Sequence, residues 1–449
     1  MQLKHRLTLV IMASLLMFTS CKKDKGNDEV VLSADDKLKD SVLMYTRDIY
    51  LWYNQIPADF NPRKYADPNA IMEAIRTYSM EPPNSRPVDR FSFAAKKVDW
   101  DNRSSGVSQD FGFSIFFLSN TDLRVKFVER NSPAGKAGIQ RGWRIIKING
   151  STNINTDQAT INTIVAAVFE SNSTSFTFQK PDGTSVDITL NAATYQTHPV
   201  MVDSTYTIAG KKIGYLVLNS FLGDLTAIKA ELNRVFTRFV TYGVTDVVVD
   251  LRYNGGGFVS LAETLSNYLA PASATGTLMM KQQYNDKYSK FDVSYNFKKL
   301  GTLELSRIFF IVSSSSASAS ELVINNLKPV LDVKLIGRND THGKPVGFFA
   351  IPVGDWYIFP VSSKTVNRNG ESNYYNGFSP ESKVADGIDK NWGDITETSL
   401  ASAIKYITTG AFRLMPGEEY REVPEVTVGN HKLDKEAFKG AVSASKSLK

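Results

Sequence analysis

The chain has 449 residues, enough for two or three domains, and 42% of them are hydrophobic, which supports a sizeable core. Its formal net charge of +6 comes from mixed charges without a basic tract, so nothing in the composition indicates nucleic-acid binding. A single cysteine excludes an intramolecular disulfide, so stability must come from packing. No cluster of His, Asp and Glu has metal-ligand spacing, and no cofactor or metal is expected.

The first twenty residues have the pattern of a targeting segment. Lys4 and Arg6 precede an apolar run, residues 7–18, that is too short to span a bilayer. Small residues then lead to Cys21. This pattern resembles the signal of bacterial lipoproteins, which implies cleavage before Cys21 and a lipid anchor on that residue in the cell envelope, at the outer membrane or the periplasmic face. The alternative is an ordinary signal peptide with an incidental cysteine.

A polar tether and a small helical domain are expected to follow the signal. Residues 21–32 are polar and charged, as in a flexible linker, and residues 33–104 carry helical patterns. Apolar side chains repeat at helical spacing over 38–52, and 70–78 indicates a second helix. The segment 89–92, Asp-Arg-Phe-Ser, is given no chemical role.

Residues 105–192 are expected to form one module of strands and short helices. Between Ser132 and Ile145 the chain carries Ser-Pro-Ala, Ala-Gly-Ile and Gly-x-x-Ile in that order. This order resembles PDZ domains, which bind the C-terminal ends of peptides. The resemblance implies that backbone amides in the turn at Phe111, Gly112 and Phe113 bind a terminal carboxylate. The alternative is a PDZ-like spacer that binds nothing.

Residues 193–410 have the alternating strands and helices of an α/β core. The first segments expected are a linker over 194–207 and buried strands over 213–218 and 247–251. An amphipathic helix over 225–239 is expected between those strands. The second strand runs into three glycines, 255–257, which permit backbone conformations closed to other residues. A nucleotide site is disfavoured because no Lys-Ser/Thr pair follows these glycines.

A serine-rich block follows the next strand. The apolar run 308–312 predicts a buried strand, and residues 313–320 are all serine or alanine. A helix is expected from Leu322 until Pro329. A serine at such a strand-to-helix turn has its hydroxyl exposed and helix N-terminal amides nearby. A lysine from a later loop would serve as its base. The alternatives are a solvated connector or a small-residue helix contact.

The order of residues from Ser316 to Glu321, followed by Gly343 and Lys344, resembles the signature of the C-terminal processing peptidases. These are serine peptidases of family S41 that use a Ser-Lys dyad. The resemblance implies that Ser318 is the nucleophile and Lys344 the general base. The chain departs from the family pattern on both sides of the Gly-Lys pair, where it has His342 and Pro345.

The segment 250–257, Asp-Leu-Arg-x-Asn-Gly-Gly-Gly, also recurs in that family. Together with the serine block it implies an oxyanion hole made by the amide of Ala319 and one from Gly255 or Gly256.

Two questions about the site stay open at this point. Glu321 lies one helical turn beyond the nucleophile and either orients Lys344 or caps the helix N-terminus. The other question is whether a histidine serves as the base of the serine. His198 and His342 both lie outside predicted helices and strands, and neither has an evident orienting acid, so a Ser-His site is disfavoured.

The resemblance covers residues 90–410 and implies a ClpP/crotonase-like α/β peptidase core with an inserted PDZ-like domain. The expected function is a lipid-anchored serine endopeptidase that cleaves unfolded or C-terminally tagged proteins. Its partners would be protein or peptide substrates and, through the lipid, a membrane. The alternatives are a catalytically inactive, envelope-anchored peptide-binding lipoprotein on the same fold and a lipoprotein of an uptake or glycan system. Residues 411–449 are expected to be a tail or appendage.

Overall fold

The computed structural model describes residues 32–412, 433 and 440–443. A six-stranded sheet with the order β21-β16-β15-β11-β10-β9 lies at its centre. Five strands run parallel, and β9 at the edge is antiparallel to β10. The bounds of these strands in chain order are β9 Val200–Ile208, β10 Lys211–Leu218, β11 Asp246–Asp250, β15 Arg307–Ile311, β16 Asp332–Gly337 and β21 Ser382–Lys383.

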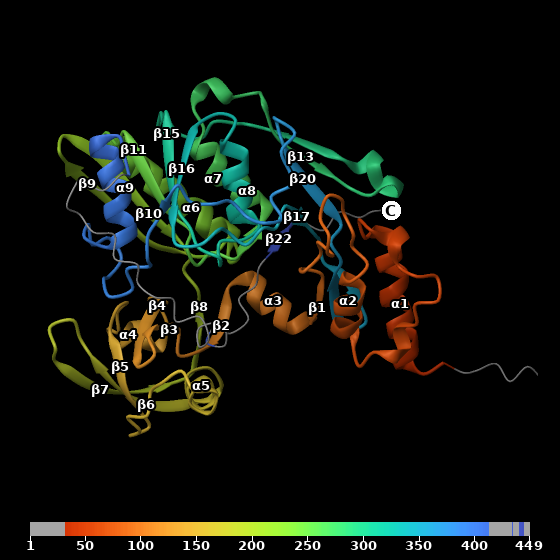
Figure 1. Ribbon diagram of the computed structural model, residues 1–449, viewed down its shortest axis with the longest axis horizontal. Coiled ribbons are helices and arrows are strands. Elements are labelled where there is room, and N and C mark those ends of the chain that lie inside the picture. The colour runs from red at the N-terminus through yellow and green to blue at the C-terminus, as the bar shows by residue number, and fades with distance from the viewer. Residues whose placement is uncertain (1–31, 413–432, 434–439, 444–449) are drawn as a thin grey trace, which may run out of the picture.

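Helices cover both faces of this sheet, so its central strands are apolar on both sides (Figure 1). Val247 and Val249 of β11 point into the core beneath α6, α7 and α8, whereas Val248 points toward α9. The helix bounds are α6 Leu225–Tyr242, α7 Val259–Leu269, α8 Ala319–Leu327 and α9 Thr398–Thr409. The predicted α/β fold class is confirmed.

Two smaller sheets extend the core. One has the order β14-β13-β20-β17 and the other β1-β19-β18. Their strands are β1 Phe93–Lys96, β13 Leu278–Gln283, β14 Val293–Asn296, β17 Val346–Gly347, β18 Ile351–Val353, β19 Trp356–Phe359 and β20 Ser363–Asn367. Short 3-10 helices in this part are η4 Ala272–Ala274 and η5 Asp286–Phe291.

The N-terminal helices share a hydrophobic core with the later chain. Val42 of α1 and Ile71 of α2 belong to the same buried cluster as Phe348 and Ile358. Strand β1 also pairs with β19, so the N-terminal region and residues 346–361 are packed as one unit. The helices here are α1 Ala34–Ile49, η1 Tyr53–Gln55, η2 Pro62–Lys64, α2 Pro68–Arg76 and α3 Lys97–Ser105.

The inserted module has its own five-stranded sheet, β3-β4-β5-β6-β7, and its own core. Figure 1 shows it below the central sheet, joined to it through the paired strands β2 and β8. Its elements are β2 Val107–Asp110, β3 Phe113–Ser119, β4 Asp122–Val128, α4 Pro133–Lys136, β5 Arg144–Ile148, α5 Gln158–Val165, the π-helical turn η3 Ala166–Glu170, β6 Ser173–Gln179, β7 Ser185–Asn191 and β8 Ala193–Gln196.

Some local predictions need correction. The linker expected at 194–207 is wrong, because β8 and β9 cover nearly all of it and only 197–199 joins them. Strand β9 is an edge strand with mostly half-buried side chains, so it lacks the apolar alternation that identifies a strand. Helix α8 begins at Ala319, three residues before the predicted Leu322, because small side chains there pack too closely to carry an apolar pattern.

Several predictions fall outside the described residues. These are the signal segment with Cys21 and most of the tail from 411 onward. Within the described part of the chain, no helix combines the length and the hydropathy needed to cross a bilayer.

Candidate active site

Ser318 occupies a strained turn between β15 and α8. Its φ of 59° and ψ of −103° lie outside the conformations that a non-glycine residue prefers, a feature that clusters at functional sites. The residue is 1% exposed, and its Oγ has no hydrogen-bond partner among the described residues. The turn therefore presents a hydroxyl that the surrounding structure has not engaged.

The small residues around Ser318 hold the serine turn against the glycine loop. Oγ of Ser316 donates to the carbonyl oxygen of Leu251 at 2.7 Å, and Oγ of Ser320 donates to that of Asn254 at 2.8 Å. The amide of Ala317 donates to the same Asn254 carbonyl at 3.1 Å. Serine and alanine are needed here because two backbone segments approach each other with little room for side chains.

The predicted oxyanion donors lie where these segments meet. A Cβ added to Gly256, whose φ is 108°, would lie 3.1 Å from the amide nitrogen of Ala319, so only glycine permits this approach. The amide of Gly256 donates to Oδ1 of Asn254 at 2.9 Å. Of the two glycines considered, Gly255 is therefore the one whose amide has no partner among the described residues, as is also true of Ala319 at the start of α8.

Lys344 is buried on the other side of the turn, with 1% of its surface exposed. Its Nζ lies 3.8 Å from the centre of the Phe348 ring and 4.9 Å from that of Phe91. Burial lowers the pKa of Lys344 well below 10.5; the charges of Asp89 and Glu321 oppose this shift but do not outweigh it. Neutral lysine, the form that can accept a proton, is favoured by this environment.

Glu321 connects the serine turn to the lysine loop. One carboxylate oxygen accepts from the amides of Ser318 and Lys344, each at 2.8 Å, and the other accepts from Oγ1 of Thr341 and the amide of Gly343, each at 2.6 Å. Capping of the helix and positioning of Lys344 are therefore compatible roles for Glu321, because its carboxylate bonds both the start of α8 and the main chain of Lys344. Burial raises the pKa of Glu321, although these four hydrogen bonds oppose the shift.

The segment Asp89 to Ser92 contacts Lys344 and its loop, and the sequence analysis did not predict this contact. The ring of Phe91 lies against Lys344, and Nη2 of Arg90 donates to the carbonyl oxygens of His342 (3.3 Å) and Tyr375 (3.0 Å). Some 250 residues separate this segment from the lysine loop. Nothing in the spacing of the sequence indicates this contact.

Neither candidate histidine reaches the nucleophile. His198 lies 3.8 Å from Glu231, between β8 and β9, and its pKa is lowered chiefly by burial. His342 donates its amide to the carbonyl oxygen of Ser316, and its ring packs edge-on against Phe91. Oγ of Ser318 bonds neither a histidine nor Lys344 within the described chain, so the alternatives differ in the burial and lowered pKa of Lys344, not in a bond already formed.

A buried ionic network links the glycine loop to the module. Nη1 of Arg252 lies 2.8 Å from both Asp386 and Glu397, and its Nε lies 3.0 Å from Asp250. Arg141, which belongs to the module, reaches the same Asp386 at 2.7 Å. Burial opposes ionisation of Asp386, but the charges of the two arginines outweigh it and lower its pKa.

Arg141 also contacts the glycine loop directly. Its Nη1 donates to the hydroxyl of Tyr253 at 2.8 Å, and Tyr253 is two residues before the predicted oxyanion donor Gly255. Lys126 and Phe127 of the module also pack against the Tyr253 ring, so several side chains of the module contact the residue that precedes the glycine loop.

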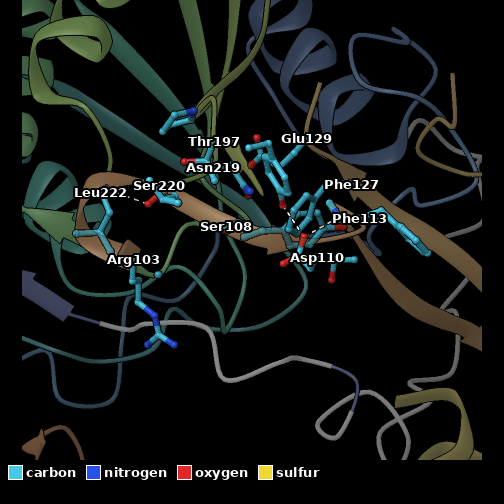
Figure 2. A pocket seen from close by; sticks show the side chains of 18 of the residues that line it. Arg103, Ser108, Asp110, Phe113, Phe127, Glu129, Thr197, Asn219, Ser220 and Leu222 are labelled. Carbon is cyan, nitrogen blue, oxygen red and sulfur yellow. Dashed lines mark hydrogen bonds between the residues drawn. The ribbon is translucent and has the colours of Figure 1, made fainter. Parts of the chain in front are cut away.

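A cleft of about 590 Å³ separates the module from the core (Figure 2). Asp110, Phe113 and Glu129 line it from the module, while Ser220 and Gly255 line it from the core. The cleft thus leads from the module to the glycine loop. Burial raises the pKa of Glu129, which accepts a hydrogen bond from the amide of His198 at 2.9 Å.

The predicted peptide-binding turn lies at the rim of this cleft. The amide of Gly112 donates to Oδ1 of Asp110 at 2.7 Å, and the side chains of Phe111 and Phe113 belong to the module's hydrophobic cluster. Strand β3, which starts at Phe113, pairs with β4 along one edge, and no described strand pairs with its other edge. A peptide bound at that edge would contact backbone groups more than the buried aromatic side chains. Across the described residues, no group of three or more His, Cys, Asp or Glu side chains is placed to hold a metal ion.

Comparisons of sequence and fold identify the family to which the chain belongs. The profile of the family, Peptidase family S41, matches residues 212–384, and that of its N-terminal domain matches residues 37–93. The chain belongs to peptidase family S41 and is a serine-type peptidase related to the C-terminal processing proteases. These matches confirm the predicted family and enzyme class.

Three similar proteins place the chain within this family. It is 24% identical to the carboxy-terminal processing protease CtpA of Bacillus subtilis over 74% of this chain and 67% of CtpA. It is 25% identical to CtpB of the same organism over 56% of this chain and 50% of CtpB. A crystal structure described as an S41 protease from Bacteroides fragilis superposes with a TM-score of 0.67 at 25% identity, covering 83% of this chain and 97% of that one.

Proposed function

We propose that the chain is a serine endopeptidase of the C-terminal processing type in which Ser318 is the nucleophile and Lys344 the general base. The observation that carries this proposal is the shared carboxylate of Glu321, which fixes the strained serine turn and the loop of a buried lysine with a lowered pKa to the same point. A nucleophile needs a nearby base in the correct protonation state, and this arrangement supplies it.

The reaction follows from these positions. Neutral Nζ of Lys344 takes the proton of the Ser318 hydroxyl while Oγ attacks the carbonyl carbon of the scissile peptide bond. The amides of Ala319 and Gly255 donate to the oxygen that becomes negative. The lysinium then gives its proton to the leaving amine, and water completes hydrolysis of the acyl-enzyme. Because Oγ of Ser318 has no hydrogen-bond partner here, one of the two side chains must move before the proton transfer.

The module is proposed to recruit the C-terminal ends of unfolded or tagged protein substrates. Support comes from the unpaired edge of β3 and from the cleft that connects it to Gly255. An extended peptide adds to such an edge as a further strand, with main-chain hydrogen bonds giving affinity.

The test of the dyad is peptide cleavage by the chain and by its Ser318→Ala variant. Cleavage should fall by about 10³-fold or more, since loss of a nucleophile leaves only the contribution of the oxyanion hole and binding. The matched control is Ser314→Ala, because Ser314 is exposed, whereas the hydroxyls of Ser316 and Ser320 support the glycine loop. Full cleavage by Ser318→Ala would overturn the assignment of Ser318 as the nucleophile. Binding of peptides by a wild-type chain that cleaves none would leave an inactive peptide-binding protein as the answer.

The proposed location is the cell envelope, with a lipid on Cys21. The support is the sequence pattern before Cys21, which lies outside the described residues. Cys21→Ser should move the protein from the detergent phase to the aqueous phase in a membrane fractionation. Retention of the variant in the detergent phase would show that another anchor exists.

A further inference from the structure

A segment near the C-terminus pairs with the strand that leaves the oxyanion loop. Strand β22, Gly440–Val442, runs parallel to β12, Gly256–Phe258. The amide of Gly440 donates to the carbonyl oxygen of Gly255 at 2.9 Å. Figure 1 shows β22 beside β17.

The same segment is held from the opposite side by the chain that follows Lys344. The amide of Ser443 donates to the carbonyl oxygen of Phe348 at 3.0 Å, and Val442 forms a parallel bridge with Phe348. Oγ of Ser443 accepts from Nε2 of Gln282 at 2.7 Å. The segment therefore lies between the strand that carries the oxyanion glycines and the strand that follows the general base.

A backbone carbonyl of this segment approaches the start of α8. The position that a Cβ on Gly256 would occupy is 2.4 Å from the carbonyl oxygen of Gly440 and 3.1 Å from the amide nitrogen of Ala319. The tail thus brings a peptide group into the space that adjoins a predicted oxyanion donor. A substrate strand would have to lie in that same space.

A second described residue of the tail contacts the module. Leu433 is 1% exposed and belongs to the hydrophobic cluster that contains Phe111 and Phe113. The cleft between module and core ends at Gly255, the residue that bonds Gly440. The tail therefore makes contact at both ends of the route proposed for a substrate.

We propose that residues 440–443 are an intramolecular ligand of the substrate site, bound along β12 as a parallel strand in place of a peptide substrate and displaced when a substrate binds. This inference rests on the proposed function, since it takes β12 to be the substrate edge. Gly440 has no side chain where the tail passes the glycine loop, and Val442 is 5% exposed in the core cluster with Val346 and Phe348. The site accordingly favours extended peptides with small residues beside Gly255.

The test uses the full chain in the Ser318→Ala background, so that binding is measured without cleavage. Gly440→Pro removes the amide that donates to Gly255, and Val442→Asp places a carboxylate in an apolar cluster. Val98→Asp is the matched control, because Val98 is 64% exposed. The probe is a fluorescein-labelled, unstructured oligopeptide with a free carboxylate, and its dissociation constant is read by fluorescence anisotropy.

Each tail variant should bind the probe about tenfold more tightly than the parent, because a competitor that occupies the site reduces apparent affinity by the fraction of free sites. The control should bind like the parent. Unchanged affinity in Gly440→Pro, in a protein with an unchanged melting temperature, would overturn the proposal, and this variant decides the matter if Val442→Asp fails to fold.

The active chain with Ser318 intact separates the remaining outcomes. Mass spectrometry that finds the tail shortened in this chain but intact in Ser318→Ala would make the tail a substrate and overturn its role as a standing competitor. Tighter probe binding in the tail variants, with no cleavage of any peptide by the active chain, would support the tail as a ligand while refuting the proposed peptidase reaction.

Discussion

Two buried cations lie within the same core and differ in their surroundings. Lys344 and Arg252 are 1% and 2% exposed. Aromatic rings face the ammonium group of Lys344, and burial lowers its pKa. Arg252 is bonded by the carboxylates of Asp250, Asp386 and Glu397, whose charges outweigh burial and raise its pKa well above its ordinary value.

The difference shows that burial does not by itself decide whether a cation keeps its charge. The balance of burial against nearby charge decides it: burial outweighs the charges of Asp89 and Glu321 at Lys344, whereas the charges of three carboxylates outweigh burial at Arg252. The lowered pKa of Lys344 suits the general-base role proposed for it, whereas Arg252 keeps its charge and bonds three acids beside the glycine loop. We therefore propose a chemical role for Lys344 and a structural one for Arg252.

The largest effect is expected when the lysine is replaced. Lys344→Ala should lower kcat/KM by about 10³-fold or more, as loss of Ser318 does, and the two losses should not add. Lys344→Arg should fail as well, since a guanidinium does not release its proton at working pH. Cleavage of a labelled peptide measures this, with melting curves to check folding. An active arginine variant would erase the distinction between the two cations.

The pH dependence sharpens the same prediction. The folded-state pKa of Lys344 lies below its unfolded value, so the rate should rise as pH increases through the folded-state pKa. Between these two pKa values the unfolded chain binds more protons, so the contribution of Lys344 to stability also grows with pH. A rate that falls over this window would contradict the general-base role.

The second largest effect is expected for Arg252, and on stability more than on chemistry. Arg252→Met should lower the free energy of unfolding by about 3–5 kcal/mol, because it leaves buried carboxylates without their cation. Denaturant unfolding measures the change. Arg234→Met is the control, since Arg234 pairs with Asp203 and Glu231 at the surface with 47% of its side chain exposed. Equal losses of unfolding free energy in the two variants would show that the buried network contributes no more to stability than the surface pairs do.

The sequence allowed the α/β class to be predicted, because buried strands and amphipathic helices alternate. It also allowed Ser318 and Lys344 to be proposed as reacting groups, because a family pattern marks them, but it did not indicate the residues that support them. The supports depend on contacts between distant residues: Phe91 lies against Lys344 from the N-terminal region, and Arg141 reaches Asp386 from the module. No local pattern encodes such contacts, so spacing and propensity could not reveal them.

The link between module and core should have an intermediate effect. Arg141→Ala removes the bonds to Asp386 and Tyr253 while Arg252 still pairs with Asp386, so kcat should fall by about tenfold with KM much less changed. Steady-state kinetics separate the two constants. Arg144→Ala is the control, because this side chain pairs with Asp122 within the module. A change in KM alone would make Arg141 a contact for substrate and not a positioning residue.

The smallest effect is expected at the turn from Asp110 to Phe113, where a substrate's terminal carboxylate is proposed to bind. The amide of Gly112 already donates to Asp110, and the carboxyl group of Glu129 also lines the cleft, so a substrate carboxylate meets acidic neighbours there. Lys126 lines the same cleft, with its Nζ 4.5 Å from the centre of the Tyr253 ring, and it is the residue whose charge we test there.

Amidation of a substrate's C-terminus tests this recognition. It removes one charge, and a single charge contact in a solvated cleft contributes about 1 kcal/mol, so KM should rise by roughly fivefold with kcat unchanged. The measurement compares free-acid and amidated forms of one peptide, with Lys126→Met to show whether the preference depends on that lysine. Equal KM values would leave the module as a spacer or gate. Charge-dependent roles would then be proposed only in the core, where Lys344 is the proposed base and Arg252 bonds three acids beside the glycine loop.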